Sequence, residues 1–171
     1  MACSRSRPLG LLAPCLALLC CGGPSRTYRD VVVDYSDGAL ELVAGREVLQ
    51  VFIANHDRVT AVAVMMSAPK EGAAACHVVF KLRARQRSFA IAERQIPCAS
   101  LPRRDWVRFD FTPLVGSWGQ RLEIALESPD GRPGAAPAVL TASVPRIYPK
   151  GRLRVAGEVV PGALRFMTFH R

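Results

Sequence analysis

The sequence lacks the short motifs that mark most catalytic and metal-binding sites. It contains no GxSxG nucleophile turn, no phosphate-cradling glycine loop and no CxxC pair. Its only histidines are His56, His77 and His170, and no two of them stand in an HxH or HxxxH arrangement. These absences argue against a serine hydrolase, a P-loop protein, a dithiol redox protein and a local zinc site. We therefore expect no catalytic residues, no metal site and no enzymatic activity.

Aromatic residues and lysines are also scarce. Aromatics make up 7% of the chain, fewer than a sugar-cleaving enzyme usually offers its substrate. No stretch repeats the interleaving of aromatics and arginines that a nucleic-acid stacking surface requires, so we expect no nucleic-acid partner. Of 23 basic residues only Lys70, Lys81 and Lys150 are lysines, and with 14 acidic residues the net charge is +9. This charge indicates either a solvated basic surface, in a chain from a GC-rich genome, or an anionic partner such as an acidic polysaccharide or a phospholipid headgroup.

Residues 1–24 have the pattern of a signal peptide. Arg5 and Arg7 precede an apolar run of 13 residues, 9–21, which is interrupted by Pro14 and is too short to span a bilayer comfortably. Ordinary cleavage near residues 22–25 would export the rest of the chain to the periplasm or the outer cell envelope. An uncleaved anchor and a misassigned start are the alternatives.

The end of the same run resembles a bacterial lipoprotein signal, in which a cysteine after small residues is lipidated. Cys21 is the candidate for lipidation, although Cys20 stands where Gly, Ala or Ser is usual. We therefore expect contact with a membrane only through the leader or a lipid anchor.

Four of the six cysteines lie in the leader, which leaves Cys76 and Cys98. An even number in an exported chain predicts a disulfide, with two buried free thiols as the alternative. Segments 76–84 and 89–98 are predicted to form a hairpin in which Cys76 lies opposite Cys98. Pairing near the turn then requires a bulge, which we place near residues 93–94.

The clearest secondary-structure signal lies in residues 106–130. Val107, Phe109 and Phe111 alternate with charged residues, and Leu122, Ile124 and Leu126 stand opposite in parity to Arg121, Glu123 and Glu127. Alternation with a period of two predicts antiparallel strands with one face in the core and one face in water. Trp106 has the parity of the wet face. The linker 112–120 is rich in turn residues and is longer than a hairpin turn.

The rest of the chain has the same character. Short apolar runs separated by Gly, Pro and Asp turns predict about eight to ten strands, with no convincing helix after the leader. The expected fold is all-β: a two-sheet antiparallel jelly-roll sandwich preceded by an N-terminal signal helix. The predicted organisation is a leader at 1–24, an N-terminal approach segment at 25–45 and a β-sandwich domain at 46–171.

Four blocks of sequence carry a family resemblance: VFIANHDRVTAVAVMMS (51–67), DWVRFDF (105–111), SWGQRLEIALESPDG (117–131) and YPKGRLRVAGEVVPGALRF (148–166). Together they resemble a galactose-binding-like jelly-roll domain of bacterial cell-envelope and glycosyltransferase-associated proteins. The resemblance covers roughly residues 45–170. It implies recognition of carbohydrate or of an envelope component, and it supplies no catalytic residues.

The candidate ligand-binding residues are loop aromatics and one polar turn. Trp118 and Tyr148 lie in predicted loops, and Trp106 is expected to be partly exposed; for each of them structural packing is the alternative. His56 and Asp57 form a loop that either contacts a ligand or caps itself. No cofactor is expected, although a structural calcium ion is common in such jelly rolls. Asp57, Asp105 and Asp130 are possible oxygen ligands, but no spacing singles them out.

These observations favour an exported, non-enzymatic module that binds glycan or an envelope component. The alternative is a structural or assembly protein whose sheet face docks on another envelope protein, which a contiguous exposed apolar patch would favour. A remote third hypothesis is a small glycan-active enzyme, which would need two facing carboxylates in a cleft.

Overall fold

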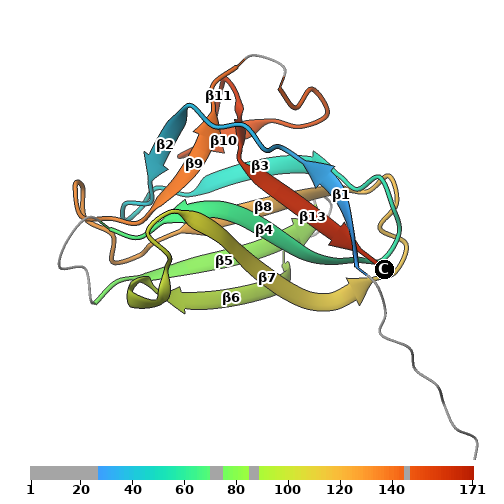
Figure 1. Ribbon diagram of the computed structural model, residues 1–171, viewed down its shortest axis with the longest axis horizontal. Helices are drawn as coiled ribbons and strands as arrows, with labels where there is room; N and C mark the ends of the chain where they lie inside the picture. The colour runs from blue at the N-terminus through green and yellow to red at the C-terminus, as the bar shows by residue number, and fades with distance from the viewer. Residues whose placement is uncertain (1–26, 70–74, 85–88, 145–146) are drawn as a thin grey trace, which may run out of the picture.

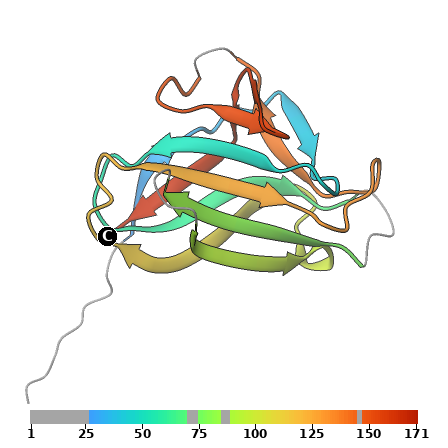
Figure 2. The same ribbon diagram turned by 180° about the vertical axis from the view of Figure 1, so that it is seen from behind.

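The computed structural model describes residues 27–69, 75–84, 89–144 and 147–171, which form two antiparallel sheets packed face to face (Figures 1 and 2). This confirms the predicted all-β, two-sheet class. The described residues form thirteen strands, more than the expected eight to ten, because residues 153–170 are divided among four of them. The predicted leader and its lipidation candidate, Cys21, lie outside the described residues.

The first sheet, sheet A, has β4 at its centre. Its strands are β1 (Tyr28–Val32), β13 (Phe166–His170), β4 (Val59–Ser67), β9 (Ala138–Ala142) and β12 (Ala163–Leu164), with β2 (Gly38–Glu41) paired to β9 and β7 (Asp105–Leu114) paired to β4. β1 and β2 come from the predicted approach segment, 25–45, and both belong to this sheet. The first and last strands of the described chain are neighbours, since Tyr28 lies opposite His170.

The second sheet, sheet B, follows the order β11 (Glu158–Val160), β10 (Leu153–Val155), β3 (Val48–Ile53), β8 (Arg121–Glu127), β5 (His77–Ala84) and β6 (Ala90–Pro97). A single 3-10 turn, Cys98–Ser100, follows β6 within the described residues. In Figure 1 sheet A is in front, and in Figure 2 sheet B is in front.

The core lies between the sheets and follows the predicted alternation. Leu122, Ile124 and Leu126 are fully buried, as are Val62, Val64 and Met66. Two aromatic pairs join the sheets. Phe80 of β5 stacks on Phe109 of β7 with ring centroids 4.1 Å apart, and Phe52 of β3 contacts Phe166 of β13 at 5.8 Å. Burying one such side chain stabilises the fold by about 1.5–3 kcal/mol.

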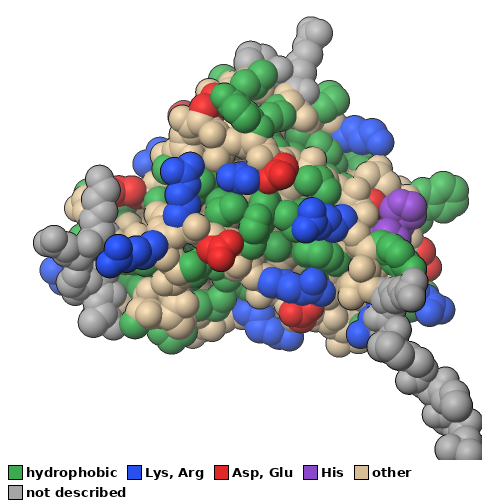
Figure 3. Space-filling model, viewed as in Figure 1, with side chains coloured by type: hydrophobic (Ala, Val, Ile, Leu, Met, Phe, Trp, Pro, Cys, Tyr) green, Lys and Arg blue, Asp and Glu red, His purple; other side chains and the backbone are tan. Residues whose placement is uncertain are grey.

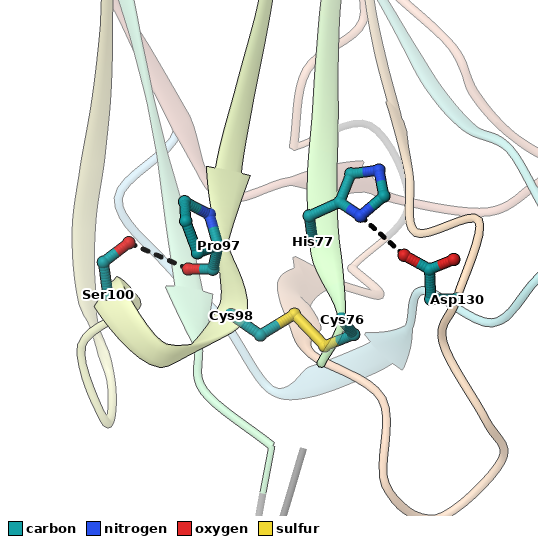
Figure 4. The surroundings of a disulfide bond; sticks show 6 residues. All are labelled: Cys76, His77, Pro97, Cys98, Ser100 and Asp130. Carbon is teal, nitrogen blue, oxygen red and sulfur yellow. Dashed lines mark hydrogen bonds and ion pairs between the residues drawn. A yellow bond between two sulfur atoms is a disulfide. The ribbon is translucent and has the colours of Figure 1, made fainter. Parts of the chain in front are cut away.

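The predicted disulfide is confirmed. Cys76 and Cys98 are bonded across the end of the β5–β6 hairpin, with their Cα atoms 5.4 Å apart (Figure 4). Val78 pairs with Ile96, as predicted. The bulge is nearer the turn than predicted: Leu82 pairs with Ala92 and Arg83 with Ala90, so Ile91 is the extra residue. The pattern of alternation fixed the faces of the two strands but did not show which residue lacks a partner.

Candidate functional site

The outer face of sheet B carries a hollow of about 290 Å³. The floor of the hollow is formed by two paired strands. Val51 of β3 lies opposite Glu123 of β8, and Ile53 lies opposite Arg121. Because side chains two residues apart share a face, Arg121 and Glu123 both point away from the core. The segment leading into β10 forms one wall. The lining residues are Val51, Arg121, Glu123, Pro149, Lys150, Gly151, Arg152 and Arg154.

The hollow is strongly basic, with four cations around one carboxylate. The neighbouring cations of the same face are neutralised, since Lys81 pairs with Glu127 at 2.6 Å and Arg83 with Glu47 at 2.9 Å. In contrast, no carboxylate of the described residues forms an ion pair with the three arginines of the hollow, Arg121, Arg152 and Arg154. Unpaired guanidinium groups around a concavity attract anions and can bind them in a bidentate manner.

The wall of the hollow depends on a close backbone contact at Gly151. A Cβ atom at this position would lie 1.9 Å from the carbonyl oxygen of Val51 and 2.5 Å from the Tyr148 ring. Only a glycine therefore lets the wall approach β3 this closely. The contact is held by the Val51 amide, which donates to the carbonyl of Arg152 at 2.9 Å.

Tyr148, one of the predicted ligand residues, lies behind this wall. Its hydroxyl accepts a hydrogen bond from the Ile53 amide at 3.0 Å, and its ring meets Phe166 edge-on at 5.6 Å. Burial raises the pKa of its phenol, a shift that the Ile53 hydrogen bond opposes and the charge of Asp30 reinforces. In this position Tyr148 supports the wall.

Trp118, the second loop aromatic, is held out in solvent with 76% of its surface exposed. The loop that carries it is fixed: the Ser117 amide donates to Asp57 at 2.9 Å, and the Gly119 amide donates to the carbonyl of Ala54 at 2.8 Å. No ring contact among the described residues joins Trp118 to Tyr148, although both adjoin the end of β3.

The other predicted ligand residues lie away from the hollow or stabilise loops. Trp106 is on the outer face of sheet A, half-buried, with the Arg165 guanidinium 5.3 Å from its ring centroid. Asp57 accepts hydrogen bonds from backbone amides, chiefly that of Arg58, and these lower the pKa of its carboxyl group. The Asp57 carboxylate therefore caps its own turn, as the alternative reading expected. The His56 ring takes no part in this cap.

The three aspartates considered for calcium do not come together. Asp57 bonds the Ser117 loop, Asp105 accepts from the Trp106 amide at the far end of β7, and Asp130 pairs with His77 beside the disulfide (Figure 4).

A different cluster forms beside the end of β13, where the antiparallel β1 begins. Asp30 of β1, His56 of the β3–β4 loop and His170 of β13 each place one potential metal-ligand atom within 4.8 Å of the others. Figure 3 shows histidine side chains at the surface of this end of the molecule. The sequence did not indicate this cluster, because its members lie far apart in the chain. Only the pairing of the first strand with the last brings them together.

A scan against protein-family models finds no match for the chain, and a search of curated proteins finds none. Among the described residues there is no helix with the length and apolar character needed to cross a membrane.

Proposed function

We propose that the chain is an exported, non-enzymatic β-sandwich module that binds an acidic glycan of the cell envelope in the basic hollow of sheet B. One observation carries the proposal: four cations and a single carboxylate surround a hollow of about 290 Å³. Guanidinium groups match the geometry of carboxylate, sulfate and phosphate groups, and they gain most where no protein carboxylate already occupies them.

The exposed Trp118 supports a carbohydrate over a small inorganic anion. It stands three residues before Arg121, on a loop tied to the end of β3. An exposed aromatic ring offers an apolar surface to the CH groups of a sugar, while arginines hold its acidic groups. The resemblance to galactose-binding-like domains is in line with this role, as an analogy of fold.

The charges of the hollow favour binding over hydrolysis. Glycoside hydrolysis generally uses two carboxyl groups that flank the scissile bond. Among the described residues, Glu123 is the only carboxylate that lines the hollow.

The alternative, docking on another envelope protein, rests on exposed apolar side chains. These come from separate elements: Tyr28 and Val32 from β1, Val115 and Trp118 from the β7–β8 loop, and Val159 from β11. Such scattered residues are ordinary for a soluble surface, and a contiguous patch would be needed to favour docking.

The test is calorimetric titration of the protein with an oligogalacturonate and with a neutral malto-oligosaccharide of equal length. We expect the acidic sugar to bind, the neutral sugar to bind weakly or not at all, and the affinity to fall at high ionic strength. The Arg121→Gln/Arg154→Gln variant should lose binding. Arg132→Gln, which removes an exposed arginine away from the hollow, should retain it.

Two further arms separate the sources of anionic groups. Vesicles containing an anionic phospholipid and inorganic phosphate are titrated under the same conditions. Binding to vesicles but to no oligosaccharide would replace the glycan with a lipid headgroup. Equal binding of both sugars, or unchanged binding by the double variant, would contradict the proposed site.

A further inference from the structure

The cluster of Asp30, His56 and His170 brings together three segments of the chain. β1 and β13 are paired, with Tyr28 opposite His170 and Arg29 opposite Phe169. The β3–β4 loop is attached to β1 by the Asn55 amide, which donates to Asp30 Oδ2 at 3.1 Å. His56, the next residue, then lies with its Nε2 atom 3.9 Å from Asp30 Oδ1. The cluster is thus fixed by the sheet and by a backbone hydrogen bond.

Two polar atoms of this cluster are buried without partners. The Asp30 side chain is fully buried, and its Oδ1 atom forms no hydrogen bond within the described residues. His170 Nδ1 is also buried without a partner. Buried polar groups are nearly always hydrogen-bonded, and a buried carboxylate is normally paired with a cation or bound to a metal. No Lys or Arg side chain of the described residues forms an ion pair with Asp30.

We propose that Asp30, His56 and His170 form a binding site for a divalent transition-metal ion of the Zn²⁺ type. Two imidazole nitrogens and one carboxylate oxygen are a ligand set that zinc accepts, whereas Ca²⁺ and Mg²⁺ prefer oxygen ligands alone. This site is separate from the basic hollow and does not depend on the proposed function. With three protein ligands, the fourth position of a tetrahedral ion is left for water or for a group of a partner.

The ligand spacing requires a small local adjustment. The three atoms lie within 4.8 Å of one another, and tetrahedral zinc holds its nitrogen and oxygen ligands roughly 3.3 Å apart. The rings of His56 and His170 are stacked, with centroids 4.2 Å apart and planes 10° from parallel. Two parallel rings cannot both direct a nitrogen lone pair at one ion, so one ring must tilt. His56, whose side chain is 56% exposed, is free to do so.

The experiment is a Zn²⁺ titration by calorimetry, together with thermal unfolding at increasing Zn²⁺. The full chain carries no polyhistidine tag and has Cys3, Cys15, Cys20 and Cys21 replaced by serine, because free thiolates would bind zinc themselves. His56→Phe keeps a ring to stack on His170 but removes the ligand nitrogen. Asp30→Asn keeps an acceptor for the Asn55 amide. His77→Phe removes the histidine outside the cluster and is the matched control.

We expect one zinc ion per chain and a melting temperature that rises with Zn²⁺ concentration. His56→Phe and Asp30→Asn should each weaken binding by at least about 100-fold, since loss of outer-shell partners alone typically costs 10- to 100-fold. His77→Phe should bind as the parent does. The proposal is overturned if the parent binds no zinc, or if His56→Phe, shown to be folded by circular dichroism, binds it as tightly as the parent.

Discussion

The arginines on the outer face of sheet A and those of the hollow on sheet B differ in their partners. On sheet A, Arg108 lies 4.1 Å from the centroid of the Phe169 ring and pairs with Asp110 at 2.9 Å, and Arg165 pairs with Asp34 at 2.6 Å. On sheet B, the arginines of the hollow have no such partners among the described residues. Figure 3, which views the sheet A face, shows basic and acidic side chains beside one another over apolar surface.

Strand register explains what the arginines of sheet A do. Phe169 lies opposite Ala61 on one side of β4, and Arg108 lies opposite Ala63 on the other. A contact between Arg108 and Phe169 must therefore pass over β4. The two small alanines below it are buried although they point away from the core. The comparison indicates that Arg108 and Arg165 cover β4 on sheet A, whereas the arginines of the hollow on sheet B stay available for an anion.

The largest effect is expected where the arginines have no partners. Arg121→Gln/Arg154→Gln should lower the affinity for the oligogalacturonate by about 100-fold, because each hydrogen bond to a charged group contributes about 1.5–3 kcal/mol. The unfolding free energy should change by less than about 0.5 kcal/mol, since neither side chain holds the fold. Titration calorimetry and urea unfolding measure the two quantities. A large loss of stability in this variant would erase the distinction between the faces.

Gly151→Ala should affect both quantities. The added Cβ would meet the backbone oxygen of Val51 at 1.9 Å, so the wall of the hollow must move away from β3. Overpacking of this kind typically costs about 1–3 kcal/mol. We expect a lower urea midpoint together with weaker glycan binding. Gly45→Ala, at a position with open space but a positive φ of 76°, measures the cost of backbone strain without a clash and is the comparison for stability.

Arg108→Ala is the converse test on sheet A. Removal of this side chain uncovers the alanines of β4 and ends the contact with Phe169. We expect a loss of about 1 kcal/mol in the unfolding free energy, since a partly exposed cation–aromatic contact contributes about 0.5–1 kcal/mol and burial adds to it. The affinity for the oligogalacturonate should not change. Weaker glycan binding in Arg108→Ala would indicate that net charge, and not the hollow, governs binding.

The fold could be predicted further than the site. Alternation with a period of two identified the buried faces around Phe109 and Ile124, and the two cysteines left after the leader predicted the Cys76–Cys98 bond. Register was less accessible, because a bulge such as that at Ile91 moves a pairing without changing the apolar pattern.

The sites depend on register and on distant pairing. Arg121 and Arg154 belong to one hollow only because β8 and β10 flank β3. The net charge was compatible with a solvated surface or with an anionic partner, and it gave no place to such a partner. Asp30 and His170 are 140 residues apart in the sequence, and no local spacing could have indicated that they meet. Loop aromatics such as Trp118 were identified because turn residues surround them, a signal that is local.

The smallest expected effect concerns the loop that presents Trp118, and it tests whether this loop is held by the charge of Asp57. Hydrogen bonds from the amides of Arg58, Ser117 and Gly116 favour the ionised form of Asp57 and lower the pKa of its carboxyl group below the ordinary 3.8. A carboxyl group whose pKa is lower in the folded state than in the unfolded state adds stability above the unfolded pKa and loses it as the pH falls through the folded value. We therefore expect the parent to lose stability below about pH 4, and Asp57→Asn to show a shallower acid dependence.

Thermal unfolding from pH 7 to pH 2 measures both. Arg132→Gln, which changes no carboxyl group, is the control and should leave the acid limb as steep as in the parent. If Asp57→Asn instead leaves that limb unchanged while glycan binding falls, the Asp57 carboxylate contacts the ligand and does not merely hold the loop.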